Sequence, residues 1–344
     1  MIDFSYRDLI AIENIFQAWK EFRKEKGNKS DVQIFERNLE DNIFNLYDKL
    51  KNKRYQHGPY EDFYVNDPKR RHIHKANVVD RVLHHLLYKY LYNTFDKTFI
   101  YDSYSCRIDK GTHRAVLRLE KFTRKVSRNY TGDCWALKLD IKKFFASVDH
   151  NILLGLLEKR IQDKDILELL KEVILSFNSD VLGGKGIPLG NLTSQVFANI
   201  YLNELDQYIK QNLKAKYYIR YADDFVIVSA DNEYLKELIP KIESFLIYNL
   251  KMKLHPKKII LRKLSWGIDF LGYIVLPHII LPRTKTKRRV FKKIERKIKE
   301  YGDKKISYFS LNQTAQSYLG YFKHSSSYVL TQKLKDYLWF RVNP

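Results

Sequence analysis

The sequence predicts an α+β protein built around a four-stranded sheet with the element order β-α-β-β-α-β. The alternation of apolar residues over 136–141 predicts a first strand. Two runs rich in β-branched and aromatic residues meet at Asp223 and Asp224, which predicts a hairpin over 217–229. The order matches the ferredoxin-like plan, in which the first strand ends beside the central hairpin. Asp140 is therefore expected close to Asp223 and Asp224.

The remaining elements are predicted from the spacing of apolar residues and from the residues typical of turns and helix caps. Helices are expected over 5–55. A basic loop or hairpin follows at 66–74, and a long apolar stretch that begins at Val78 predicts the next helix. Asp149 stands where the N-cap of a helix would stand. A Gly-rich loop over 183–190 leads into a helix over about 192–213, and a helix over 233–249 and a strand near 258–263 complete the sheet unit.

Composition limits the class of protein and its partners. The 344 residues are 44% hydrophobic and 14% aromatic, which indicates a folded chain, and the net charge of +22 favours a polyanion as partner. The first twenty residues are mixed in charge and no run of about eighteen apolar residues occurs, so we expect neither a secretory signal nor a membrane span. Two cysteines fit a reducing cytoplasm. We expect a cytoplasmic protein that binds nucleic acid.

The segment from Arg283 to Lys305 is the most basic part of the chain. It holds twelve Lys and Arg against three acids, with apolar residues at helical spacing. This pattern predicts a helix with one apolar stripe and a cationic outer face that contacts phosphates, with Lys292, Lys293 and Arg296 as candidates. A merely solvated helix is the alternative for any single lysine.

The adjacent carboxylates of Asp223 and Asp224 repel each other unless a cation occupies the site. Together with Asp140 they supply the hard oxygen ligands that Mg²⁺ prefers, with Mn²⁺ able to replace it. Two such ions about 4 Å apart serve phosphoryl chemistry by activating a hydroxyl and stabilising the leaving group. The alternative is a solvated acidic turn.

Several motifs in register resemble those of reverse transcriptases. The segments 140–149 and 221–224 are similar to the palm motifs of that family, and the segments 80–82, 104–107 and 111–113 are similar to fingers motifs of its group II intron branch. The segment 254–258 resembles the lysine-bearing motif, and 266–273 resembles the primer grip. The resemblance covers about residues 60–325.

The resemblance implies a right-hand polymerase with fingers, a ferredoxin-like palm and a helical thumb. Its expected parts are an N-terminal helical extension (1–60), fingers (61–134), a palm (135–275) with the fingers–palm loop 178–195 and the primer grip 266–273, and a basic thumb (276–344). It also implies RNA-directed DNA synthesis with template RNA, a DNA or RNA primer and dNTPs. The metal ions would lie on Asp140, Ile141, Asp223 and Asp224.

One difference from the motifs of most reverse transcriptases narrows the resemblance to a single branch of the family. Most reverse transcriptases carry Gln between the Pro and Gly of the loop before the second palm helix, whereas this chain has Leu189 before Gly190, followed by Ser194 and Gln195. This signature resembles the reverse transcriptases of diversity-generating retroelements. The resemblance implies frequent errors at template adenines, mutagenic retrohoming of the cDNA, and a small basic accessory variability protein as partner.

The same resemblance gives roles to further residues, each with an alternative. Arg71 would contact the triphosphate, while Lys69 and Arg70 read as solvated charges. Phe145 would block a ribose 2′-hydroxyl or be a core aromatic. Leu189, Gly190 and Gln195 would line the nucleotide pocket, although a buried amide at Gln195 would look the same in sequence. Lys258 would protonate pyrophosphate or lie on a strand edge. Trp266 and Gly267 would hold the primer.

The remaining sequence patterns are weaker evidence for a function. His72, His74, His84 and His85 lack a carboxylate or Cys at ligand spacing, so a solvated or packed reading is preferred to zinc. The Gly-rich loop lacks the P-loop pattern. The competing functions are an antiphage or unassigned group II-like reverse transcriptase and a non-catalytic RNA-binding scaffold, and the intact aspartates argue against the scaffold.

Overall fold

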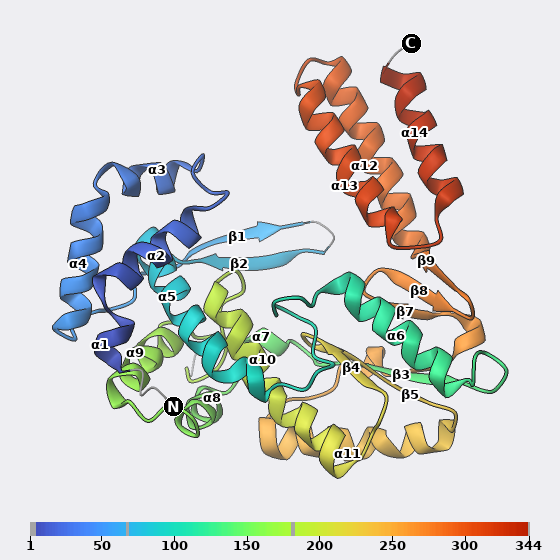
Figure 1. The fold of residues 1–344 in the computed structure, drawn as a ribbon, viewed down its shortest axis with the longest axis horizontal. Helices are drawn as coiled ribbons and strands as arrows, with labels where there is room; N and C mark the ends of the chain where they lie inside the picture. Colours follow the sequence, from blue (N-terminus) through green and yellow to red (C-terminus); the bar gives the residue numbers. More distant parts are fainter. Residues whose placement is uncertain (1–4, 67–68, 180–182, 343–344) are drawn as a thin grey trace. The chain divides into compact units, whose positions relative to one another are not determined.

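The computed structural model describes residues 5–66, 69–179 and 183–342 (Figure 1). The chain forms two compact units that alternate along the sequence. Unit 1 comprises Met1–Arg107, Asp140–Ala215 and Pro240–Lys257, and unit 2 comprises Ile108–Leu139, Lys216–Ile239 and Lys258–Pro344. No helix among the described residues combines the length and the apolar character that crossing a membrane requires.

Unit 1 begins with four helices, which confirms the helical prediction for 5–55. They are α1 (Tyr6–Leu9), α2 (Ile12–Arg23), α3 (Ser30–Arg37) and α4 (Leu39–Lys51). Their apolar faces are buried, and the rings of Trp19 and Phe35 lie 4.9 Å apart between α2 and α3. The helix α2 packs against α5 (Val78–Phe95), whose N-cap Asn77 accepts a hydrogen bond from the Asp80 backbone. The 3-10 helix η1 (Asp96–Thr98) follows α5.

Of the basic stretch 66–74, residues 71–74 belong to a strand of a hairpin, and residues 67 and 68 lie outside the described part of the chain. Strands β1 (Glu61–Val65) and β2 (Arg71–Lys75) are antiparallel, with Glu61 opposite Lys75 and Val65 opposite Arg71.

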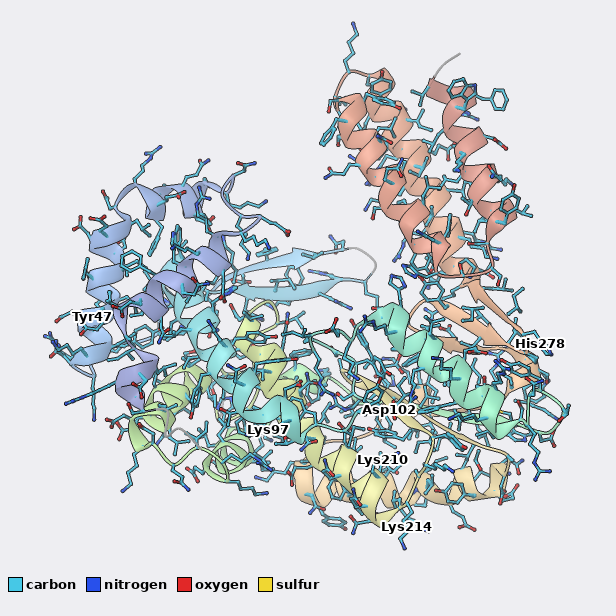
Figure 2. All side chains as sticks on the ribbon, in the orientation of Figure 1. Tyr47, Lys97, Asp102, Lys210, Lys214 and His278 are labelled. Carbon is cyan, nitrogen blue, oxygen red and sulfur yellow. The ribbon has the colours of Figure 1, made fainter. Side chains whose placement is uncertain are left out.

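The rest of unit 1 is helical. Its helices are α7 (Phe144–Ser147), α8 (His150–Glu158), α9 (Lys164–Leu175) and α10 (Leu192–Gln207), with the π-helix η2 (Tyr208–Asn212) directly after α10. Asp149 caps α8 by accepting a hydrogen bond from the Ile152 backbone, as predicted, and also pairs with Lys251 at 2.8 Å. The helix α10 is buried on most sides against α5 and α8, and the labelled Lys210 marks its C-terminal extension in Figure 2.

The predicted ferredoxin-like sheet is confirmed. Its strands are β3 (Trp135–Asp140), β4 (Tyr218–Tyr221), β5 (Asp224–Ser229) and β6 (Ile260–Lys263), in the spatial order β4-β5-β3-β6. All four lie in unit 2 except Asp140, where the chain passes into unit 1. The helix α6 (Thr112–Val126) packs on β4 and β5, and α11 (Asn232–Leu250) follows β5 (Figure 1).

Unit 2 continues with a small sheet and a helical bundle. The 3-10 helices η3 (Pro256–Lys258) and η4 (Leu264–Trp266) flank β6, and β7 (Ile268–Phe270), β8 (Tyr273–Leu276) and β9 (Ile279–Pro282) form an antiparallel meander. His278, labelled in Figure 2, occupies the β8–β9 turn, and its ring lies 4.3 Å from that of Tyr130. The bundle comprises α12 (Thr284–Gly302), α13 (Tyr308–Lys323) and α14 (Tyr328–Val342).

A tyrosine network joins the bundle to the meander. The Tyr273 hydroxyl donates to the Tyr321 carbonyl at 3.0 Å and lies 3.1 Å from Nδ1 of His113. The Tyr321 hydroxyl donates to the Gly272 carbonyl at 2.6 Å. The His113 ring also stacks on that of His324, with centroids 3.6 Å apart. Burial raises the pKa of Tyr273, so its hydroxyl stays neutral and available as a donor.

We predict that Tyr273→Phe destabilises the protein by about 1–3 kcal/mol, because the Tyr321 carbonyl loses its buried donor. The free energy of unfolding in urea measures this. Tyr248→Phe is the control, since Tyr248 is 82% exposed and should change stability by less than about 0.5 kcal/mol. Equal stabilities of the two variants would show that the network contributes nothing.

Candidate active site

The acidic hairpin of unit 2 is a tight two-residue connection. Tyr221 pairs with Asp224, so Ala222 and Asp223 form the turn and Asp224 is the first residue of β5. Only one of the two aspartates therefore lies at the tip that the sequence predicted for both. Ala222 has a φ of +52°, a left-handed conformation that favours glycine. The side chains of Asp223 and Asp224 are half-buried.

A buried arginine supports this turn. Arg220 is fully buried in β4, and its Nη1 donates to the Ala222 carbonyl at 3.2 Å. The Tyr221 hydroxyl accepts a hydrogen bond from Thr112 of α6 at 3.4 Å. These contacts hold the backbone of the turn where glycine is missing. Sequence analysis missed Arg220, although an arginine in an otherwise apolar strand is a visible signal.

Lys138 is a second residue that sequence analysis missed. Its Nζ lies 3.0 Å from Oδ2 of Asp224 and donates to the Asp269 carbonyl at 2.9 Å. Lys138 and Asp140 are two residues apart on β3, so they face the same side of the sheet. Because β3 and β5 are neighbouring strands, this contact supports the expectation that the end of β3 lies beside the hairpin.

The donor set fits a divalent cation by its chemistry. Half-exposed carboxylates are the hard oxygen ligands that Mg²⁺ takes, and the Lys138 ammonium shows that Asp224 already attracts a cation. Within the part of the chain that the structure describes, no three His, Cys, Asp or Glu side chains form a ready metal site.

In unit 1, the residues that follow β3 are anchored by their backbone. The Asp140 carbonyl accepts a hydrogen bond from the His255 backbone at 2.8 Å, and Ile141 forms a bridge with Leu254. Ile141 is buried, so any contact with a cation would have to come from its carbonyl rather than its side chain. The segment that carries the predicted lysine motif thus holds the start of the first palm motif.

The second group of predicted residues lies around the β1–β2 hairpin of unit 1. The His74 backbone donates to the Leu189 carbonyl at 2.9 Å, and the Asn191 side chain donates to the His74 carbonyl at 2.9 Å. The loop with Leu189 and Gly190 is therefore joined to β2, the strand that begins with the exposed Arg71. Burial lowers the pKa of His74, so its neutral form is favoured.

Phe145 is connected to the same loop. Its carbonyl accepts a hydrogen bond from the Ile187 backbone at 2.8 Å, two residues before Leu189. Phe144 is 2% exposed and fills the core, whereas Phe145 is half-buried. The core alternative therefore suits Phe144, and Phe145 keeps a surface that a ligand can reach.

The remaining predicted residues have distinct surroundings. Gln195 is exposed on α10, so the buried-amide alternative is wrong. Lys258 ends η3 rather than occupying a strand edge. Trp266 is 60% exposed, and its ring meets that of Trp135 edge-on at 5.8 Å. Gly267 has a φ of +77°, and a Cβ there would lie 2.5 Å from Ile274, so the backbone itself requires glycine.

The helix α12 confirms the helix that was predicted within the basic segment 283–305. Val290 and Ile294 are buried in the bundle, while Lys292 and Arg296 are exposed and Lys293 is half-buried. Arg296 also lies 3.5 Å from Glu300, one turn further along. The apolar stripe and the cationic face therefore lie on different sides of the helix.

The four histidines do not form one cluster: His72 and His74 lie together on β2, with ring centroids 4.3 Å apart, whereas His84 and His85 belong to α5. Burial lowers the pKa of His84 to about 3, and its Nδ1 lies 2.6 Å from the Thr193 hydroxyl. His72 pairs with Asp62 in the hairpin, and His85 packs on the Phe22 ring. The preference against zinc at these histidines stays a prediction.

We predict that Gly190→Ala destabilises the protein by about 1–3 kcal/mol. Gly190 has a φ of +121°, and a Cβ would lie 2.8 Å from the Ile73 side chain. Gly155→Ala is the matched control: Gly155 lies inside α8 with open space around it, so alanine should stabilise the helix by about 0.5–1 kcal/mol. Thermal unfolding of both variants decides, and a Gly190→Ala protein as stable as wild type would contradict the analysis.

Comparisons with known proteins agree with this geometry. Residues 65–275 match the family model described as reverse transcriptase (RNA-dependent DNA polymerase). The COX1/OXI3 intron 2 protein of Saccharomyces cerevisiae is 24% identical over 260 residues, covering 58% of this chain and 29% of that protein. The group II intron-encoded protein LtrA of Lactococcus lactis subsp. cremoris is 24% identical over 342 residues, covering 78% of this chain and 56% of that protein.

The chain thus spans less than two thirds of the length of these relatives. Among solved structures, apo telomerase from Candida tropicalis superposes with a TM-score of 0.52 at 12% identity, covering 77% of this chain and 52% of that one. That likeness supports the right-hand polymerase fold. Since the family model covers more than half of the sequence, the chain belongs to the reverse transcriptase family.

Proposed function

We propose that this chain is an RNA-directed DNA polymerase that copies a template RNA into cDNA from a primer and dNTPs. The observation that carries the proposal is the β4–β5 hairpin, which holds Asp223 and Asp224 beside the strand that ends in Asp140. The adjacent carboxylates are retained although they repel, and this argues against the non-catalytic scaffold.

The proposed mechanism assigns each residue one task. Asp140, Asp223 and Asp224, with the Ile141 carbonyl, would hold two Mg²⁺ ions, which stabilise the negative charge of nucleotidyl transfer when bound. Arg71 would bind the triphosphate oxygens with its guanidinium. Lys258 would supply a proton to the leaving pyrophosphate.

Other residues would set the geometry of the substrates. The exposed surface of Phe145 would lie against the sugar and exclude a 2′-hydroxyl. Trp266 and Gly267 would hold the primer end. Lys292, Lys293 and Arg296 would hold the template–primer duplex through its phosphates, which makes binding depend on salt rather than on sequence.

We predict that Asp223→Asn lowers primer extension at least about a thousandfold, because charge stabilisation of the phosphoryl group is lost. Without metal, its stability should hold or rise, since one of two repelling carboxylates is removed. Primer extension on an RNA template and thermal unfolding measure the two effects. Asp41→Asn, on the exposed face of α4, is the control and should extend primers normally. A folded Asp223→Asn protein with wild-type extension would remove the metal assignment.

We further propose that the enzyme belongs to a diversity-generating retroelement and makes errors opposite template adenine, with a small basic accessory protein as partner. The support is the signature formed by Leu189 and Gly190, on a loop that is joined to the β1–β2 hairpin, and by Ser194 and Gln195 in the first turn of α10. Leucine supplies shape but neither donor nor acceptor, so a mispaired nucleotide loses less binding free energy relative to the correct one. An antiphage or unassigned group II-like reverse transcriptase would share the chemistry without this error pattern.

Leu189→Gln should reduce misincorporation at template adenine several-fold, because one hydrogen bond of about 1 kcal/mol changes an error ratio by that much. Sequencing cDNA made by both enzymes on the same RNA measures the effect, with the error rates at the other three template bases as internal control. Wild-type errors that are rare and evenly spread over the four bases would overturn the retroelement assignment and leave a general reverse transcriptase.

A further inference from the structure

The ammonium of Lys138 lies where three strands of unit 2 meet. It contacts Oδ2 of Asp224 on β5 at 3.0 Å and the carbonyl of Asp269 on β7 at 2.9 Å, while Lys138 itself belongs to β3. The Phe270 ring centroid lies 5.8 Å from the same Nζ. The two side chains of the ion pair are only 16% and 21% exposed. At this burial, solvent screens the attraction less than it screens a surface pair.

The position of this ammonium conflicts with that of a divalent cation. A carboxylate oxygen at 3.0 Å from a lysine is already engaged by a positive charge. A cation that binds Asp224 must either displace the lysine from Oδ2 or approach a neighbouring positive charge. Both alternatives weaken cation binding relative to the same carboxylates without the lysine.

We propose that Lys138 is a positioning residue that serves as the internal counter-ion of Asp224 and lowers the affinity of the site for divalent cations. The inference rests on the proposed function, since it takes Asp224 as a metal ligand. In the metal-free protein Lys138 neutralises one of the two adjacent carboxylates and keeps the hairpin stable. When a cation binds, the lysine releases Asp224.

The second contact of Lys138 gives the released ammonium a place to remain. The Asp269 carbonyl accepts one of its three protons independently of Asp224. The Asp269 side chain is itself paired with Arg283, which fixes this part of β7 at the base of α12. Lys138 thus links the carboxylate hairpin with β7, the strand within the proposed primer grip.

Mn²⁺ binding to the full chain, followed by electron paramagnetic resonance of the free ion, tests the proposal without any polymerase assay. Lys138→Met keeps the length of the side chain and removes the charge, so the dissociation constant for Mn²⁺ should fall about three- to tenfold. Lys138→Arg keeps the charge and should restore the wild-type constant. In the absence of metal, Lys138→Met should unfold at a lower temperature than wild type.

Lys263→Met is the matched control. Lys263 also lies on a strand of this sheet and pairs with an aspartate, Asp133, at 2.7 Å. It stands opposite Trp135, at the start of β3, whereas Asp140 is at its end. Its replacement should leave the Mn²⁺ constant unchanged.

The outcomes separate this inference from the proposed function. If Asp224→Asn binds Mn²⁺ like wild type, the metal site of the proposed function is wrong. If Asp224→Asn loses Mn²⁺ but Lys138→Met binds it no more tightly than wild type, the site stands and the counter-ion role of Lys138 is wrong. Should Lys138→Met fail to fold, Lys138→Gln is measured by the same criterion.

Discussion

Repulsion between two adjacent carboxylates is the constraint on which the site depends. Asp223 ends a two-residue turn and Asp224 begins β5 directly after it, while the left-handed conformation of Ala222 in the turn adds backbone strain. Such a turn persists only because its surroundings determine it. Arg220 beneath the turn, Lys138 on the neighbouring strand and Thr112 on α6 supply these surroundings, each from a different element of unit 2. The sheet and its neighbouring elements therefore keep the carboxylates of Asp223 and Asp224 close together at the β4–β5 hairpin.

The loop of unit 1 that carries Leu189 and Gly190 is likewise held in place by its surroundings. Its polypeptide chain is held by backbone and amide hydrogen bonds to β2, and its glycine occupies a conformation that a side chain would strain. Phe145 is tied to this loop through its carbonyl and not through its ring. The groups proposed to meet the nucleotide are thus positioned by main-chain contacts, which leaves their side chains available for ligands.

Much of the fold could be predicted from the sequence because its signals are local. The alternation before Asp140, the apolar runs around the paired aspartates and the capping aspartate at 149 each follow from short-range preferences. The exposure of Gln195 and the position of Asp224 within β5 could not, since both depend on register and on which face of a helix is covered. Lys138 escaped notice because its partners Asp224 and Asp269 are far away in sequence, and Arg220 because its contact with the Ala222 carbonyl depends on the shape of the turn. Charged residues inside strands of otherwise apolar character were the available clue.

The bond between the His74 backbone and the Leu189 carbonyl has a consequence for how such an enzyme can evolve. Because this hydrogen bond uses only the main chain, the side chain of Leu189 can be exchanged without losing it. Under the role that we propose for Leu189, copying accuracy and structural integrity are separate traits, and selection can adjust one while the other stays constant. A lineage that benefits from sequence variation could therefore acquire an error-prone enzyme through one substitution at position 189.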